Sequence, residues 1–236
     1  MDNYLAQFDE TPSTEAFSLQ NSKLLRVALR NVTIQAKLGS MVAYQGDVKF
    51  EHAGKGGMGR MLKKAMTGEG QNLMKISGSG EVFLAETAQE IHVITLQNDK
   101  VTVNGANLLA FDAGIDWNIE RMQGVSGMMG GGMYNTALQG TGSVAILSDG
   151  PPVRLDVGSA PTYADPQAAI TWSSGVTTSV KTDVSFKTLT GRGSGESVQM
   201  AFGGQGWVLV QPSEGRPVPT AASGGSSGGL GGLLKG

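Results

Sequence analysis

The two histidines, His52 and His92, are the side chains of this chain best suited to bind a metal ion. Glu90 and His92 are two residues apart, which would put both on one face of a strand. Glu51 or Glu81 would have to supply a further ligand from elsewhere in the chain. Because a zinc site needs three or four protein ligands, we expect no metal and no cofactor here, and these side chains are interpreted as ordinary surface residues.

Other patterns that could support chemistry each lack a required member. GSGEVF (78–83) begins like a dinucleotide-binding loop, but its sixth residue is Phe83 and a strand is expected to follow instead of a helix. GKGGMGRMLKK (54–64) resembles a phosphate site without its Gly-Lys-Ser/Thr ending. Asp112 and Asp116 flank a predicted turn, and the preference of Asp for turns explains both carboxylates without a catalytic role. With 0 cysteines and no Ser-His-Asp pattern, we expect no enzymatic activity.

The composition narrows the class of protein further. The chain has 236 residues with a net charge of −2 and no basic stripe, so nucleic acid is not an expected partner. Its 36 glycines among 236 residues are far above the ordinary glycine content of about 7%, and they indicate many turns and bulges. The acidic N-terminus has no secretory pattern and no apolar window reaches the roughly 18 residues of a membrane span, so we expect a cytoplasmic protein.

The elements that would position any site are predicted to be short strands. LLRVALRNVTIQAKL (24–38) favours a strand, and MVAYQGDVKFEH (41–52) suggests a hairpin that turns at Gly46–Asp47. IHVITL (91–96) and VTV (101–103) suggest two strands that flank a turn at 97–100. Further alternating runs lie at 73–77, 82–85, 117–122, 153–157, 168–172, 178–189 and 198–202. This spacing predicts an all-β sandwich or barrel.

A glycine-centred pattern recurs along the chain. In the three clearest copies a Gly-x-Gly precedes an apolar run, and the second glycines follow at intervals of 62 and 64 residues. Glycine in a strand costs about 0.5–1 kcal/mol relative to alanine, so the repetition indicates bulges, sharp bends or close approach of strands. The copies are GSGEVFLAE (78–86), GTGSVAILSDG (140–150), GQGWVLVQPSEG (204–215) and a weaker GSMVAYQGD, and the candidate structural glycines are Gly39, Gly80, Gly142 and Gly206.

The recurrence suggests that one β unit has been duplicated. Gly39 and Gly80 would belong to the first unit and Gly142 and Gly206 to the second, with three unequal repeats as the alternative. The chain then divides into a flexible N-terminal arm (1–21), a first β unit (22–118, with an insertion at 54–70), a second β unit (119–212) and a disordered Gly/Ser/Pro-rich tail (213–236).

Three segments outside the expected strands could bind partners. The insertion has helical spacing, which predicts one short inserted helix, and the loop at 124–140 is rich in glycine and methionine. Both could form subunit contacts; the alternatives are a structural cover, anion binding or a membrane contact for the helix, and a flexible surface loop for the second segment. The candidate interface residues are Met58, Met61, Leu62, Met128, Met129 and Met133; the candidate basic surface is Arg60, Lys63 and Lys64; and a candidate docking motif in the tail is Leu230, Leu233 and Leu234.

Several of these segments in order resemble a known family. GGMGRMLKKAMTGEG leads into LMKISGSGEVFLAE, and LQGTGSVAILSDG and GESVQMAFGGQGWVLVQPSEG follow. Together they resemble the altered-inheritance-of-mitochondria protein twenty-four family over roughly four-fifths of the chain. The resemblance implies a duplicated fold like that of the tryptophan RNA-binding attenuation protein (double-stranded β-helix class), trimers in a pseudo-sixfold ring, and no established enzymatic activity. Mitochondrial members of that family are linked to inner-membrane organisation.

Tryptophan or RNA binding is not carried over, because the chain is acidic and no ligand residues match position by position. We expect a homotrimer that acts as a non-catalytic oligomeric scaffold or binding protein, with a possible protein client bound through the C-terminal tail. The alternatives are a small-ligand-binding ring with sites between β units and a peripheral organiser at a membrane surface.

Overall fold

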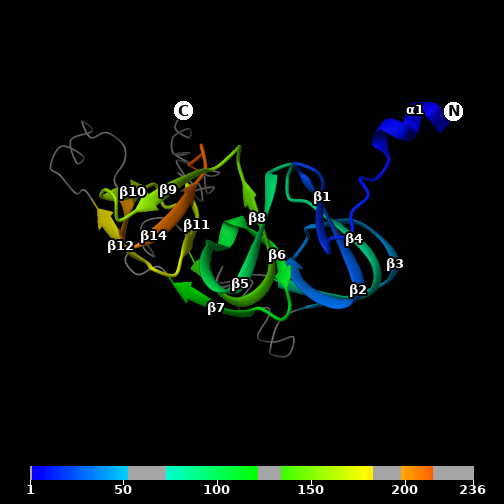
Figure 1. Ribbon diagram of the computed structural model, residues 1–236, viewed down its shortest axis with the longest axis horizontal. Helices are drawn as coiled ribbons and strands as arrows, with labels where there is room; N and C mark the ends of the chain where they lie inside the picture. Colours follow the sequence, from blue (N-terminus) through cyan, green and yellow to red (C-terminus); the bar gives the residue numbers. More distant parts are fainter. Residues whose placement is uncertain (1, 53–72, 122–133, 183–197, 215–236) are drawn as a thin grey trace, which may run out of the picture.

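The computed structural model describes residues 2–52, 73–121, 134–182 and 198–214, and most of these residues lie in strands (Figure 1). The predicted all-β class is confirmed, whereas the predicted helix at 54–70 lies outside the described residues. The elements are α1 (Asp2–Leu5), η1 (Ala6–Phe8), β1 (Phe17–Asn21), β2 (Leu24–Lys37), β3 (Met41–His52), β4 (Leu73–Leu84), β5 (Glu90–Asn104), η2 (Gly105–Asn107), β6 (Leu108–Asp112), β7 (Asp116–Arg121), β8 (Tyr134–Ser148), β9 (Val153–Val157), β10 (Thr162–Ala164), β11 (Ala169–Ser173), β12 (Val176–Thr182), β13 (Val198–Gly204) and β14 (Gly206–Val210).

The strands form two antiparallel sheets. In the larger sheet the order is β3-β4-β2-β6-β8-β5-β11-β14-β9, with β1 paired to β2 and β7 paired to β8. The smaller sheet has the order β10-β13-β12. Figure 1 shows an elongated molecule in which β3 lies at one end and β9, β10 and β12 lie towards the other. The two ends of the long strand path therefore lie far apart in one chain.

The described core consists of three hydrophobic clusters that follow one another along the molecule. The first is built on β2 and β4 around Ile34 and Ile76. The second is built on β5, β6 and β8 around Phe111, and the third on β9, β11, β13 and β14 around Trp172. Each cluster contains buried residues on both sides of one Gly-x-Gly: Ile76 and Val82, Leu138 and Val144, and Phe202 and Val208. The division into two units with boundaries at 22–118 and 119–212 stays a prediction.

Two Gly-x-Gly copies mark bends within the long strands β4 and β8, and the third joins β13 of the smaller sheet to β14 of the larger sheet. Both glycines of every copy have positive φ, a conformation that costs other residues energy and that glycine adopts freely. The neighbouring strand makes a matching irregularity, since Asn31 in β2 and Asn98 in β5 also have positive φ, of 60° and 57°. The φ values are +121° and +154° for Gly78 and Gly80, +138° and +149° for Gly140 and Gly142, and +89° and +147° for Gly204 and Gly206.

Two predicted turns are wrong. Gly46–Asp47 does not close a hairpin, because β3 continues through it from Met41 to His52 with Gly46 at a φ of 96°. Residues 97–100 do not form a turn either, because β5 continues through them with a bulge at Asn98. In both cases a residue with positive φ bends a continuous strand opposite a Gly-x-Gly, and the Asn98 amide donates to Thr141 Oγ1 at 2.9 Å.

The N-terminal arm is shorter than the predicted 1–21. Phe17 begins β1, pairs with Val27 and is buried in the first cluster. Thr11 and Gln20 are joined by two hydrogen bonds, from Thr11 N to Gln20 Oε1 at 2.7 Å and from Gln20 Nε2 to Thr11 O at 3.2 Å. The buried Arg26 side chain donates to Ser18 Oγ at 3.2 Å and to Ser13 O at 3.4 Å. These contacts tie the chain to the sheet from about residue 11 onwards.

Candidate functional site

The residues that the sequence singled out fall into two groups. All of the candidate interface, basic-surface and tail residues lie outside the described residues, so their roles stay predictions: Met58, Met61, Leu62, Met128, Met129, Met133, Arg60, Lys63, Lys64, Leu230, Leu233 and Leu234. The four candidate glycines are described, and all of them have positive φ. Three of them lie where a side chain would collide with a neighbour.

The space around the glycines differs from bend to bend. A Cβ atom at Gly80 would lie 2.0 Å from the backbone oxygen of Gln45 in β3. At Gly142 it would lie 2.8 Å from the Asp112 carboxylate, and at Gly206 it would lie 2.1 Å from Ser173 Oγ. Nothing lies within 4 Å of such an atom at Gly39. Close approach therefore explains the three Gly-x-Gly copies, and backbone conformation alone explains Gly39.

His92 and Ser148 are the described pair that most resembles catalytic machinery, with His92 Nε2 and Ser148 Oγ 2.8 Å apart. Ser148 is completely buried, and its hydroxyl donates its one proton to the backbone oxygen of Gly150 at 2.7 Å. Ser148 therefore accepts the proton of Nε2. Burial lowers the pKa of His92, against the nearby Glu90, which raises it. The pair positions a loop and leaves the serine without a base.

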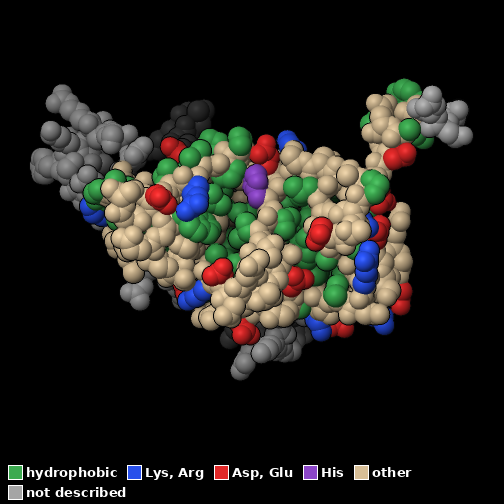
Figure 2. Space-filling view, viewed as in Figure 1, with side chains coloured by type: hydrophobic (Ala, Val, Ile, Leu, Met, Phe, Trp, Pro, Cys, Tyr) green, Lys and Arg blue, Asp and Glu red, His purple; other side chains and the backbone are tan. Residues whose placement is uncertain are grey.

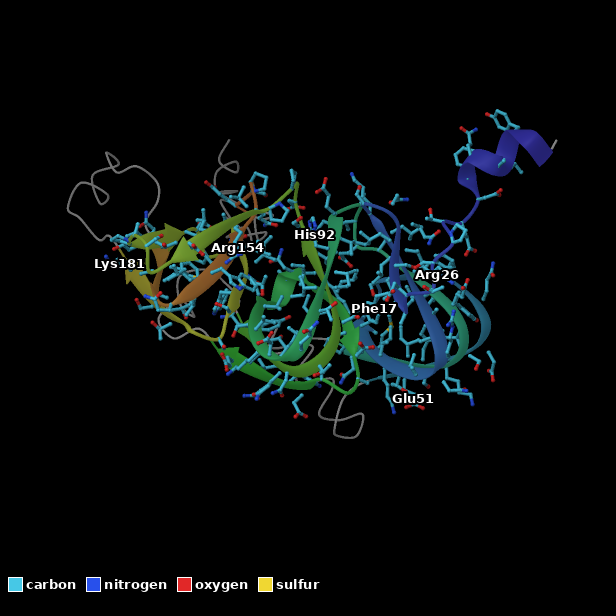
Figure 3. All side chains as sticks on the ribbon, viewed as in Figure 1. Phe17, Arg26, Glu51, His92, Arg154 and Lys181 are labelled. Carbon is cyan, nitrogen blue, oxygen red and sulfur yellow. The ribbon has the colours of Figure 1, made fainter. Side chains whose placement is uncertain are left out.

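A polar cluster beside this pair joins segments at residues 89, 149, 167 and 211. The Gln211 Oε1 atom accepts a hydrogen bond from Asp149 N at 2.9 Å, while Gln211 Nε2 donates to Gln167 O at 3.1 Å. Gln89 Nε2 donates to Asp149 Oδ1 at 2.9 Å. Gln211 thus satisfies backbone groups of two loops, at Asp149 and Gln167, which is a structural role. Figure 3 labels His92 in the central part of the molecule, and in the same view Figure 2 shows a purple histidine there beside hydrophobic side chains.

The exposed edge of β3 is the described surface that most resembles a binding site. In the larger sheet β3 pairs with β4 on one side, and no described strand pairs with its other side. Val42, Tyr44 and Phe50 are 57%, 50% and 37% exposed, and the rings of Tyr44 and Phe50 pack edge to face at 5.3 Å. Tyr44 and Phe50 lie opposite the buried Val82 and Ile76, so they extend the first cluster to the sheet edge. An apolar edge of this kind is suited to association.

The opposite edge of the sheet is β9, which pairs with β14 and with no other described strand. Leu155 lies opposite the buried Val208 on the core side, while Arg154 and Asp156 point to the other face and are 64% and 72% exposed. On β3 the charged Lys49 and Glu51 likewise alternate with the apolar residues. Both edges thus have one apolar face and one charged face.

The N-terminal arm contributes a second exposed apolar surface. Tyr4, Leu5 and Phe8 of α1 and η1 are exposed, and Figure 1 shows these elements projecting away from the sheets. Sequence reasoning missed this surface because the arm is polar overall. It also missed both sheet edges, because alternation does not reveal which strand lacks a neighbour.

Two features are absent from the described residues. No group of three or more His, Asp or Glu side chains is arranged to hold a metal ion in the ranges that the structure describes. Within those same ranges no helix has the length and apolar character needed to cross a bilayer.

Comparisons with known proteins agree with the fold. A family model described as mitochondrial biogenesis AIM24 matches residues 17–213, which is more than half of the chain. The crystal structure of protein SPYM3_0169 from Streptococcus pyogenes is similar to this chain, with a TM-score of 0.66 and 21% sequence identity, and the match covers 84% of this chain and 92% of that one. No curated protein matches the chain. The residues that the family model matches begin at Phe17, which is also the first residue of β1.

Proposed function

The chain belongs to the mitochondrial biogenesis AIM24 family, and from this membership we propose that it is a non-catalytic scaffold or binding protein that acts as a homo-oligomer. We propose a homotrimer as the assembled form. The cytoplasmic location expected from the sequence remains a prediction.

The observation that carries this proposal is the exposed apolar edge of β3. Val42, Tyr44 and Phe50 are large apolar side chains exposed on a strand whose outer edge no described strand covers. A monomer with such an edge is prone to uncontrolled association, whereas a closed assembly buries it. The proposed oligomer thus gives these side chains a function that a monomer does not.

The chemistry of the described polar side chains also favours a non-catalytic role. Ser148 donates to Gly150 O, so it is held as a structural residue. Asp112 Oδ2 accepts from Ser143 N at 2.6 Å, and Asp149 accepts from Gln89. Each of these groups is engaged in holding a bend or a loop.

Native mass spectrometry of the full chain tests the proposal. We expect a homotrimer, and we expect Tyr44→Lys combined with Phe50→Lys to shift it to smaller species. Lys181→Glu, on the exposed surface of the smaller sheet, is the matched control and should leave the mass unchanged. A wild-type chain that is monomeric at about ten micromolar would contradict the proposal.

A further inference from the structure

The two free edges of the larger sheet are complementary in sequence, and we propose that β3 of one copy pairs with β9 of the next copy. This inference rests on the proposed homo-oligomer and names the surfaces that form it. β3 and β9 are the two ends of one strand path. Their labelled residues Glu51 and Arg154 lie in opposite halves of the molecule (Figure 3). The pairing is therefore between copies.

Charge complementarity selects one antiparallel register. When Arg154 lies opposite Glu51, Asp156 lies opposite Lys49, so two pairs of opposite charge form on one face of the joined sheet. Within a single copy, Arg154 Nη2 donates to Asp156 Oδ1 of the same strand at 3.4 Å, and both side chains are largely exposed. Opposite charges directly across two strands stabilise the pairing, whereas like charges destabilise it.

The same register matches the apolar faces. Leu155 then lies opposite Phe50, and Val157 lies opposite Val48. Val48 packs against the first core cluster and Leu155 packs against the third, so the joined sheet would connect these two clusters across the interface. The half-exposed Phe50 side chain would gain a neighbour on its open side.

Neighbouring registers fail this test. A shift of two residues places Arg154 opposite Lys49, which brings two positive charges together. A shift of one residue turns the apolar residues of one strand to the charged face of the other. A parallel arrangement with Arg154 opposite Asp47 also matches charges, but every described strand pair in this molecule is antiparallel. We therefore infer the antiparallel pairing.

Because β3 and β9 are different surfaces, the contact is head to tail. Such a contact closes into a ring when the rotation between copies permits and otherwise forms a filament. Each copy in a ring uses both of its edges, and no edge stays open.

Charge exchange tests the pairing without changing composition or net charge. Lys49→Glu with Glu51→Lys, and separately Arg154→Asp with Asp156→Arg, should each raise the apparent dissociation constant of the assembly by about tenfold or more. All four substitutions together should restore it. Lys100→Glu with Glu120→Lys exchanges another exposed pair, 3.9 Å apart, and should leave assembly unchanged. Far-ultraviolet circular dichroism confirms that each variant folds.

Cysteine cross-linking measures the register, since the chain has no cysteine of its own. A mixture of Glu51→Cys and Arg154→Cys proteins should form a cross-linked heterodimer on mild oxidation. A mixture of Asp47→Cys and Arg154→Cys proteins should not, and its cross-linking would indicate the parallel pairing and overturn ours. Efficient homodimers of Glu51→Cys alone would indicate a symmetric β3–β3 contact and also overturn it.

The outcomes separate the two proposals. If the wild-type chain is monomeric, both the proposed oligomer and this pairing are wrong. If it assembles, while the charge exchanges change nothing and no cross-link joins positions 51 and 154, the oligomer stands and the edge pairing is wrong.

Discussion

The bends at Gly80 and Gly142 carry the same sequence motif, yet different groups lie against them. At Gly80 the neighbour is β3, whose backbone runs alongside β4 with Gly46 opposite Gly80 and Gln45 opposite Glu81. At Gly142 the corresponding place is taken by a side chain, because Asp112 Oδ2 accepts the hydrogen bond of Ser143 N. The third bend resembles the second, since Ser173 Oγ accepts from Trp207 N at 3.0 Å.

The difference shows that a side-chain oxygen can replace a missing strand. The residue after the second glycine has a backbone amide that needs an acceptor. In the first bend an additional strand lies alongside, and in the other two a single Asp or Ser meets the same need. At the second glycine of each bend a side chain would meet an obstacle, and only at Gly80 is the nearest obstacle a backbone, that of β3 in its ladder with β4.

The largest expected effect is at the first bend. Gly80→Ala should lower the free energy of unfolding by about 3 kcal/mol or more, because the new Cβ meets the Gln45 oxygen at 2.0 Å and β3 cannot move without breaking its pairing with β4. Urea denaturation of the purified variant measures this. A loss below about 1 kcal/mol would show that β3 moves freely and would remove the contrast between the bends.

Gly142→Ala should lower the free energy of unfolding by less, about 2 kcal/mol. The Asp112 side chain can rotate away from the new methyl group, but it then loses its hydrogen bond to Ser143 N, and the strain of the positive φ remains. Chemical denaturation of Gly142→Ala and Gly80→Ala under the same conditions compares their losses in the free energy of unfolding. Gly39→Ala is the control for conformational strain alone, at about 1 kcal/mol, since nothing lies within 4 Å of its new methyl group. If Gly142→Ala costs as much as Gly80→Ala, the distinction between side-chain and backbone neighbours is wrong.

Asp112→Ala should cost about 1–2 kcal/mol, because it leaves the partly buried Ser143 amide without its acceptor. Asp112→Asn keeps a carbonyl oxygen at the same place and should cost clearly less. Thermal melts of the two variants check the order. Equal losses would mean that the charge of Asp112, and not its role as acceptor, stabilises the bend.

The smallest expected effect on stability concerns a charged residue of the first bend, Glu81. Glu81 follows Gly80, and hydrogen bonding from Arg26, with Nε donating to Glu81 Oε1 at 2.9 Å, lowers the pKa of Glu81 against partial burial, which raises it. The folded pKa is thus below the unfolded one, so this stabilisation is present above about pH 4.5 and is lost as the pH falls through the folded value. Wild type should therefore lose its stability advantage over Glu81→Gln in acid.

Denaturation at pH 7 and at pH 3 measures the Glu81 effect. Glu120→Gln, an exposed residue of β7 whose carboxylate lies 3.9 Å from Lys100 Nζ, provides a control carboxylate outside the proposed interface. A stability difference between wild type and Glu81→Gln that is the same at both pH values would contradict the assignment to the Arg26–Glu81 pair.

The sequence predicted the strands and the three bends because both depend on local chemistry. Alternating apolar residues define strands such as 153–157, and only glycine tolerates the positive φ and close contacts at Gly80, Gly142 and Gly206. The same reasoning failed at Gly46 and Asn98, because positive φ serves a hairpin turn and a bulge within a strand equally well. Local chemistry alone cannot choose between these outcomes.

The candidate site was less accessible from sequence. Val42, Tyr44 and Phe50 alternate as any half-buried strand would, and nothing local marks β3 as an edge. Edge position depends on which strands pair, and β2 lies between β4 and β6 although β3 follows it in the chain. The order of strands arises from long-range contacts that a single sequence does not display.

The composition of the first core cluster has a consequence for synthesis on the ribosome. The cluster around Ile34 and Ile76 also contains Ala145 and Leu147 of β8, and β2 reaches β8 through β6. The nascent chain therefore cannot close its first core until residue 147 has left the exit tunnel. Strands β1 to β4 emerge early with open apolar faces, and pairings between segments so far apart in sequence form slowly. During translation the folding of strands β1 to β4 thus depends on β8, which is synthesised later. A chaperone that binds the exposed strands would matter most between the emergence of β4 and the emergence of β8.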